Sequence, residues 1–334
     1  MNVQGISSAI PRLLLIGSLT RDFIFYPGEA PLLEVPGGRA LYAASGAVIW
    51  EKQLALASQV GKGYPSHWCS LFQARGLQVD GIRILDQELE SRAVYSYDEA
   101  LRPGFPLVKA CLRHGVPFPP QLLGYQPQKD ASLTSCGFSP SLLPDSYHQA
   151  EGAYLCPMPL EYLAQWIAYL HTHGVKRLVA TFPGLLDVSP EYAQRLSFLE
   201  GLEVLIIHEK DLQRLFWGLS HDLWEMASWI GRFVPKVVIS LSSWRYLLYL
   251  ASSRERWEIP AYSLGRFPIG LEDAFGGGLL AGLIQTAEPQ QAVLYGAVSL
   301  AFKSESLDPF YPWEVMPDLA RSRLQYLNLL IVPA

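Results

Sequence analysis

Short apolar runs alternate with longer amphipathic segments along most of the chain. Apolar runs bounded by turn residues are typical of buried strands. They predict strands at 12–16, 22–26, 54–60, 82–85, 92–97, 177–181, 204–207, 237–241 and 246–250, and the pattern also resumes at 152–156. Apolar positions at helical spacing, or an abundance of Ala, predict helices at 39–50, 65–75, 160–173, 190–199, 211–217, 222–233, 273–286 and 290–303. Strands that alternate with helices indicate an α/β fold with a mainly parallel sheet.

Residues 86–145 interrupt this alternation. After the strand predicted at 92–97, the segment is rich in Pro, Gly, Ser and Gln and has no clear helical or strand periodicity. A loop region of this length is uncommon in a compact domain unless it has a function. We therefore expect an irregular or lid-like segment here.

The composition limits the class of protein. Half of the 334 residues are hydrophobic and only 17% are charged, so a sizeable core is available. The net charge of −5 and the lack of a basic run argue against a nucleic-acid partner. No apolar run approaches the roughly 18 residues that predict a membrane span, and none resembles a secretory signal. The four cysteines are scattered without metal-ligand spacing, which favours reduced thiols in a cytoplasmic protein.

The segment FPIGLEDAFGGGLLAGL at 267–283 carries the strongest chemical pattern of the chain. It places Asp273 at the start of a predicted helix, and Gly276, Gly277 and Gly278 follow in what would be the first turn. A helix start has unpaired N–H groups and the positive end of the helix dipole, and both suit phosphate. An acid there can take a proton from a hydroxyl while the N–H groups hold the phosphate under attack. The alternative is a capped helix whose glycines only allow close packing.

Several separated segments, in one order along the chain, resemble the ribokinase/PfkB family of sugar and nucleoside kinases. They are IGSLTRDFIF, VPGGRALYAASGA, LASQVGKGYPSHWCSLFQARGLQVDGI, LEVLIIHEKDLQRLFWG, VVISLSSWRYLLYL and GLEDAFGGGLLAGL. The resemblance covers most of the chain, from about residue 12 to 305. The resemblance implies a ribokinase-like, doubly wound α/β fold: one domain over 1–334 with a mostly parallel sheet flanked by helices. A small β lid is expected at about 22–36 and 90–100, and an irregular insertion at about 101–148.

The resemblance also implies the catalytic residues. Asp273 corresponds to the family's general base, which removes the proton from a substrate hydroxyl. The backbone N–H groups from Gly270 through Leu271 and Glu272 to Asp273 correspond to its anion hole, which stabilises the transferring phosphoryl group. Glu272 replaces a glycine of that motif, and a carboxylate near a polyphosphate is repulsive unless a metal or a Lys compensates.

The substrate residues implied by the resemblance lie near the N-terminus. Asp22 corresponds to the acid that binds substrate hydroxyls, and Gly37 and Gly38 correspond to a Gly-Gly pair that approaches the sugar. Tyr42 occupies the position of a usual Asn, and Gly63 that of a usual acid. These two differences argue against ribose as the substrate.

The implied cofactors are ATP and Mg²⁺, and most departures from the family pattern fall on their half of the site. The family's Asn-x-x-Glu motif, which is tied to the metal and the phosphates, reads His208-Glu209-Lys210-Asp211 here. His208 therefore replaces the Asn near the nucleotide. Asp211 is the expected metal ligand, and Glu209 is an alternative acid out of register.

The nucleotide loop departs further. The usual Thr-Leu-Gly-x-x-Gly reads Ser240-Leu241-Ser242-Ser243-Trp244-Arg245, so both glycines are missing. Ser240, Ser242 and Arg245 are still the residues expected to contact the nucleotide. Arg245 either binds a phosphate or is an ordinary surface residue, and the sequence leaves both interpretations open.

Two functions are consistent with this pattern. The first is an ATP-dependent kinase acting on a hydroxyl of a small sugar-like or nucleoside-like molecule, which the retained Asp273 favours. The second is a catalytically impaired ligand-binding or interaction protein on the same scaffold, which the lost loop glycines favour. In both cases the expected partner is a small molecule, with a homodimer as a possible assembly and no membrane.

Overall fold

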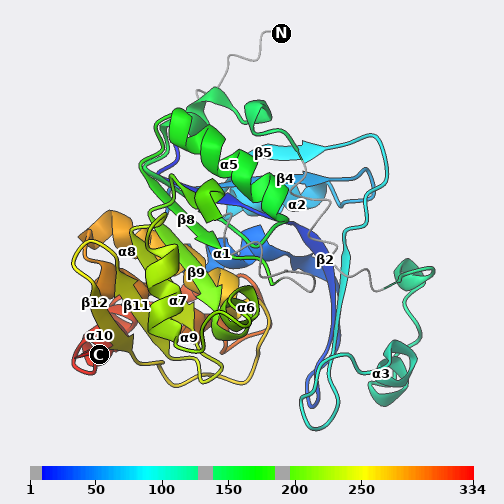
Figure 1. The fold of residues 1–334 in the computed structure, drawn as a ribbon. Helices are drawn as coiled ribbons and strands as arrows, with labels where there is room; N and C mark the ends of the chain where they lie inside the picture. The colour runs from blue at the N-terminus through cyan, green and yellow to red at the C-terminus, as the bar shows by residue number, and fades with distance from the viewer. Residues whose placement is uncertain (1–9, 127–137, 185–195) are drawn as a thin grey trace.

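Ten strands form the central sheet of the structure, a computed structural model that describes residues 10–126, 138–184 and 196–334 (Figure 1). The order across the sheet is β13-β12-β11-β10-β9-β8-β7-β1-β4-β5, parallel from β10 to β5 and antiparallel from β10 to β13. The bounds are β1 Leu13–Ile16, β4 Leu54–Val60, β5 Gln78–Ile84, β7 Gly152–Leu155, β8 Arg177–Thr181, β9 Val204–His208, β10 Lys236–Ser240, β11 Tyr246–Leu250, β12 Glu255–Ile259 and β13 Val332–Pro333. The mainly parallel α/β sheet that the sequence predicts is confirmed.

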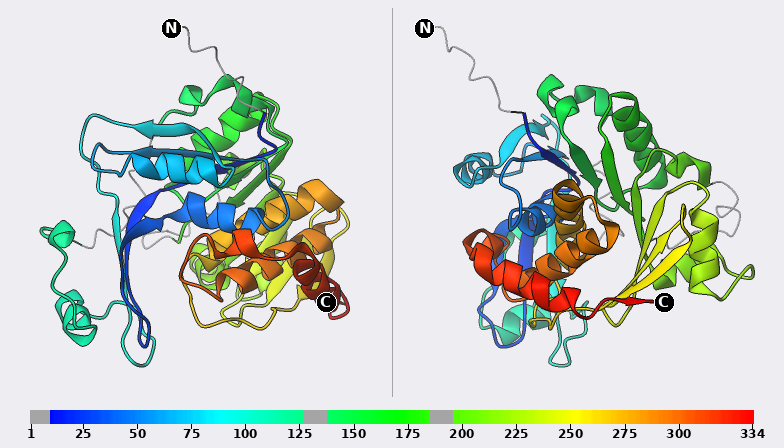
Figure 2. Two further views of the ribbon diagram at one scale, coloured as in Figure 1. Left: turned by 180° about the vertical axis from the view of Figure 1, so that it is seen from behind. Right: turned by 90° about the vertical axis from the view of Figure 1, so that its left-hand side faces the viewer.

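Helices cover both faces of this sheet (Figure 1, Figure 2). Their bounds are α1 Arg39–Ala47, α2 His67–Ala74, α3 Leu107–Arg113, α5 Leu160–Thr172, α6 Glu209–Leu215, α7 Leu223–Ile230, α8 Leu271–Thr286, α9 Pro289–Lys303 and α10 Pro317–Asn328. Successive side chains of a strand point to opposite faces. In β1, Leu13 and Leu15 therefore join the core under α1, α2, α8, α9 and α10, while Leu14 and Ile16 join the core under α5, α6 and α7.

A second, smaller sheet projects from the first and has the order β3-β2-β6 (Figure 2). It consists of β2 Thr20–Phe25, β3 Leu32–Gly37 and β6 Arg92–Ser96. Strand β2 pairs antiparallel with β3 and parallel with β6. Because β2 follows β1 after a short connection, the chain passes directly from the central sheet into the small one. These three strands largely overlap the segments expected to form a lid, at about 22–36 and 90–100.

Helices α1 and α8 pack unusually closely, and glycines allow this. A Cβ on Gly46 would lie 1.9 Å from the carbonyl oxygen of Ala274, and one on Gly277 would lie 2.0 Å from that of Ala43. Neither position could carry a larger side chain without separating the helices. Helix α8 begins at Leu271, so Gly276–Gly278 lie in its second turn. The sequence pattern predicted them in the first turn. Gly277 packs against α1 and Gly278 against α9, whereas Gly276 packs against Tyr154 of β7.

The sequence-based boundaries are wrong in several places. Strand β5 begins at Gln78, before the start of the strand predicted at 82–85, because this segment pairs with β4. The expected irregular region contains α3, which is anchored by the buried side chains of Ala110 and Cys111 against Phe23 and Phe25 of the small sheet. Strand β12 and helix α10 are rich in charged residues and were not predicted. The helix predicted at 190–199 lies largely outside the described residues.

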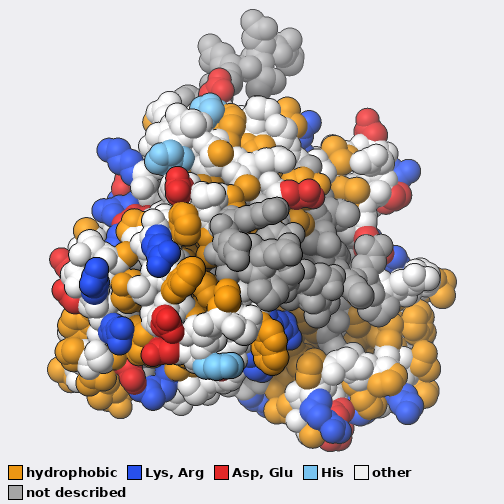
Figure 3. Space-filling view, in the orientation of Figure 1, with side chains coloured by type: hydrophobic (Ala, Val, Ile, Leu, Met, Phe, Trp, Pro, Cys, Tyr) orange, Lys and Arg blue, Asp and Glu red, His pale blue; other side chains and the backbone are white. Residues whose placement is uncertain are grey.

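The surface has the mixed charge that the composition indicates. On the face shown in Figure 3, side chains of Lys and Arg are interspersed with those of Asp and Glu. Across the described ranges, no helix combines the length and the apolar character that a membrane crossing requires.

Candidate active site

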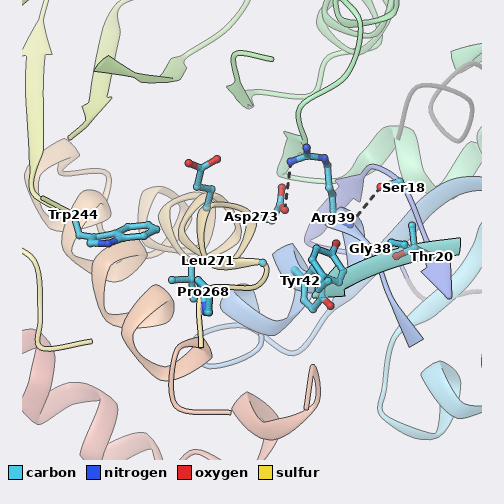
Figure 4. A pocket seen from close by; sticks show the side chains of 13 residues that line it. Ser18, Thr20, Gly38, Arg39, Tyr42, Trp244, Pro268, Leu271 and Asp273 are labelled. Carbon is cyan, nitrogen blue, oxygen red and sulfur yellow. Dashed lines mark hydrogen bonds and ion pairs between the residues drawn. The ribbon is translucent and has the colours of Figure 1, made fainter. Parts of the chain in front are cut away.

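A cavity of about 310 Å³ lies where the N-termini of α1 and α8 meet the small sheet and the β10–β11 turn (Figure 4). It is lined by Ser18, Thr20, Gly38, Arg39, Tyr42, Ala93, Tyr95, Trp244, Pro268, Gly270, Leu271, Glu272 and Asp273. The lining therefore combines segments from the two ends of the chain. A concave site with a few convergent polar groups is the usual form of a small-molecule site.

Asp273 is one of the two acids that line this cavity, with Glu272. It is the third residue of α8 and only 5% exposed, yet it lines the cavity and points toward Arg39 (Figure 4). Its Oδ2 lies 3.7 Å from Nη1 of Arg39, while its buried Oδ1 has no hydrogen-bond partner among the described residues. Burial raises the pKa of Asp273 to about 7, Arg39 lowers it and the charge of Glu272 raises it. A carboxyl with this pKa and an unpaired oxygen can exchange a proton near neutral pH.

The start of α8 supplies backbone donors beside this acid. Gly270 adopts a left-handed conformation, with φ of 73°, and the first N–H group that bonds back to it belongs to Ala274. The N–H groups of the first helical residues have no acceptor within the helix, so they are available to an anion. Gly270 is also required by space, because a Cβ there would lie 2.3 Å from the ring of Tyr42.

The sequence-predicted substrate acid, Asp22, lies behind the cavity wall. It is fully buried, and its carboxylate accepts hydrogen bonds from the hydroxyl groups of Thr20 and Tyr42. Burial raises the pKa of Asp22 to about 6, whereas these two hydrogen bonds and the charge of the buried Lys303 lower it. Asp22 does not line the cavity, whereas its two hydrogen-bond donors, Thr20 and Tyr42, do.

The two glycines that precede α1, Gly37 and Gly38, lie beside Asp22 and the cavity. A Cβ on Gly37 would lie 2.0 Å from Oδ2 of Asp22, so this position requires the absence of a side chain. Gly38 is the N-cap of α1, has φ of 102° and lines the cavity.

Three residues that line the cavity were not predicted from the sequence: Ser18, Thr20 and Arg39. Each belongs to a segment that resembles the family, so the sequence indicated the correct segments but not these side chains.

The first turn of α6 holds the acids expected near the metal. Nδ1 of His208 accepts a hydrogen bond from the backbone N–H of Lys210, 3.1 Å away, and so caps the helix. Glu209 accepts a hydrogen bond from the backbone N–H of Ser242, 2.8 Å away. Burial raises the pKa of Asp211, and the charge of Glu272 raises it further.

The β10–β11 turn differs from the sequence-based expectation. Arg245 forms an ion pair with Glu258 of β12 and does not line the cavity. Ser240 and Ser242 do not line it either, whereas Trp244 does, beside Pro268 and Leu271 (Figure 4). Trp244 has φ of 64°, a conformation that a bulky residue adopts only when its surroundings impose it.

These residues are compatible with Mg²⁺ bound together with phosphate. Within the described ranges, no three His, Cys, Asp or Glu residues form a metal-binding group. Mg²⁺ does not need one, because it keeps several waters and takes one or two carboxylates plus substrate phosphates. Burial is the main cause that raises the pKa of Asp211, His208 and Arg214 lower it, and the charge of Glu272 raises it. A divalent cation would relieve the repulsion between the two acids.

Comparison with known sequences finds one similar curated protein. The chain is 24% identical to a cytidine kinase of Thermococcus kodakarensis over 289 residues, which are 85% of this chain and 92% of that protein. No protein-family model matches the chain.

Comparison with solved structures shows the fold. A fructokinase of Xylella fastidiosa with bound ATP has a TM-score of 0.71 at 15% identity, with 95% of this chain and 98% of that chain covered. A nucleoside kinase of Burkholderia thailandensis in complex with inosine has a TM-score of 0.67 at 16% identity, with 94% and 96% covered. An aminoimidazole riboside kinase of Salmonella enterica, complexed with aminoimidazole riboside and an ATP analogue, has a TM-score of 0.66 at 17% identity, with 93% and 99% covered. The chain has the ribokinase-like fold that its motifs predicted.

Proposed function

We propose that this protein is an ATP-dependent kinase that phosphorylates a hydroxyl group of a small sugar-like or nucleoside-like molecule. The observation that carries the proposal is the buried carboxylate of Asp273, which has one unpaired oxygen beside the free N–H groups of a helix start, inside a cavity. The similarity in fold to kinases of sugars and nucleosides supports it.

Each group at the helix start has a part in the reaction. Asp273 accepts the proton of the acceptor hydroxyl as its oxygen bonds to the γ-phosphorus and ADP leaves. The N–H groups of Leu271 and Glu272 bind the oxygens of the transferring phosphoryl group. Arg39 keeps the pKa of Asp273 lower than burial alone would set it, so more of the base is ionised at neutral pH. Asp211 and Glu272 would hold Mg²⁺, which when bound neutralises phosphate charge.

The pH dependence of the rate tests the base. The reaction needs ionised Asp273, so we expect kcat/KM to rise with pH to a plateau, with a midpoint near the pKa of about 7. Glu272 raises that pKa and Arg39 lowers it. Glu272→Gln should therefore move the midpoint to lower pH and Arg39→Gln to higher pH, as measured in initial-rate profiles. Midpoints that do not respond to either change would contradict the assignment of the base.

The Mg²⁺ requirement tests the acid pair. If Glu272 and Asp211 hold the cation, Glu272→Gln raises the Mg²⁺ concentration for half-maximal rate about tenfold, equal to 1.4 kcal/mol. Glu288→Gln is the matched control, because Glu288 is exposed and lies beyond the opposite end of α8. An unchanged Mg²⁺ titration in Glu272→Gln shows that other groups bind the cation.

A second function, ligand binding without phosphoryl transfer, is favoured by two specific contacts. The N–H of Ser242, which would face a donor phosphate in a working nucleotide loop, is bonded to Glu209, and Arg245 is paired with Glu258. A thermal-shift titration with ATP and Mg²⁺ separates the two functions. The kinase is expected to gain about 3 kcal/mol of stability at a hundredfold excess over Kd. No gain with ATP, together with a gain with a sugar or nucleoside, supports the second function.

A further inference from the structure

Tyr95 of the small sheet lines the cavity, although no sequence motif predicted a site residue in this strand. It lies on β6, whose parallel register with β2 places it opposite Ile24. Its ring packs against the cluster that contains Ile24, Tyr26 and Tyr42, so the strand and the cluster hold it at the cavity wall. An aromatic side chain of the small sheet therefore lines the cavity on this side.

The hydroxyl group of Tyr95 differs from the other hydroxyls at this end of the cavity. Those of Thr20 and Tyr42 both donate their protons to Asp22, so only their lone pairs remain for a ligand. Among the described residues the hydroxyl of Tyr95 makes no hydrogen bond, and its proton remains available for donation.

Several charges surround this hydroxyl. Burial is the largest influence and raises the pKa of Tyr95 well above 10. The charges of Asp22 and Asp273 raise it further, whereas Arg39 lowers it. The phenol is therefore protonated at neutral pH, and it lies within electrostatic reach of both acids.

We propose that Tyr95 determines acceptor specificity by donating a hydrogen bond to a second hydroxyl of the acceptor, separate from the one that faces Asp273. This inference rests on the proposed function for the identity of the acceptor site. The oxygens of Thr20 and Tyr42 accept the proton of the same or a neighbouring acceptor hydroxyl. The arrangement fits a molecule with adjacent hydroxyls on a ring, such as the ribose of a ribonucleoside, better than a simple alcohol.

The test is equilibrium binding of cytidine, measured by titration calorimetry without ATP. Tyr95→Phe removes only the hydroxyl group, and we expect it to raise the Kd about tenfold. Tyr97→Phe is the matched control: Tyr97 is a buried tyrosine of the same sheet region, its ring centroid is 5.3 Å from that of Tyr26, and it does not line the cavity. Its Kd should equal that of the wild type.

The deoxy analogues identify the contact. With 2′-deoxycytidine or 3′-deoxycytidine, one of the two should bind equally to the wild type and to Tyr95→Phe, because the partner hydroxyl is already absent. Equal loss of affinity with both analogues, an unchanged Kd for cytidine in Tyr95→Phe, or an equal loss in Tyr97→Phe overturns the proposal. Failure of the wild type to bind cytidine, inosine and ribose at millimolar concentration also overturns it. Binding that follows the expected pattern without ATP turnover overturns only the proposed function.

Discussion

Asp273→Asn is expected to lower kcat by a factor of about 10² to 10⁴ while the protein stays folded, because the variant keeps the shape of the side chain and loses its ability to take a proton. The carboxylate oxygen Oδ1 is buried without a hydrogen-bond partner among the described residues, so it is free to accept the proton of the acceptor hydroxyl. Initial rates with ATP and Mg²⁺ against cytidine, inosine, ribose and fructose measure the effect.

Binding separates this loss from a structural one. The Kd of the acceptor in the absence of ATP should change little in Asp273→Asn, because Arg39 and the start of α8 stay in place. Glu288→Gln removes an exposed acid at the N-cap of α9, away from the cavity, and should have the wild-type kcat. An Asp273→Asn protein with wild-type kcat would show that Asp273 is not the base.

The same substitution is expected to stabilise the protein at alkaline pH. The pKa of Asp273 rises from 3.8 to about 7 on folding, mainly because of burial. Between these values the folded state holds a proton that the unfolded chain has released, so the free energy of unfolding falls as pH rises from about 4 to 7. Above pH 7 the buried carboxylate costs roughly 4 kcal/mol. Asn does not ionise, so the variant should recover up to this amount at pH 8.

Urea unfolding at pH 4 and at pH 8 measures this difference. At pH 4 the wild-type carboxyl is already protonated in the folded state, and the two proteins should have similar stability. Asp318→Asn is the control, because its side chain is 93% exposed, and its stability should change by less than about 1 kcal/mol at either pH. A stability gain in Asp273→Asn that is equal at both pH values would contradict the raised pKa. A loss at pH 8 would contradict it too.

The sequence predicted the fold well because its main signals are local. The apolar run at β1 and the alternation of strands with helices follow from the periodicity of buried positions, which neighbouring residues specify. The edge elements were missed for the same reason. Strand β12 and helix α10 are polar and depend on a partner element, so their own residues carry little signal.

The α8 side of the candidate site could also be foreseen. Gly270 to Asp273 all line the cavity, because a glycine in a left-handed conformation, a helix start and an acid in the first turn form one continuous local motif. The role of Gly276–Gly278 was not local. Their positions are set by α1, Tyr154 and Ser299, which lie far away in the sequence.

The other half of the site depended on contacts that no motif encodes. Asp22 was expected to face the substrate. Thr20 and Tyr42 line the cavity instead, and their hydroxyl groups donate hydrogen bonds to the carboxylate of Asp22. Arg245 was a candidate phosphate ligand, and Glu258 from the neighbouring strand pairs with it. Both outcomes depend on which side chain another element places nearby.

The sequence by itself determined the α/β architecture and an acid, Asp273, near the start of a helix, since backbone preference and hydrophobic period act over a few residues. Only the tertiary structure decided which polar groups face the cavity. The burial and hydrogen bonds of Asp22 and the position of Tyr95 at the cavity wall depend on strands and helices that meet across the whole chain. The free energy of a charge or a hydroxyl depends on those neighbours.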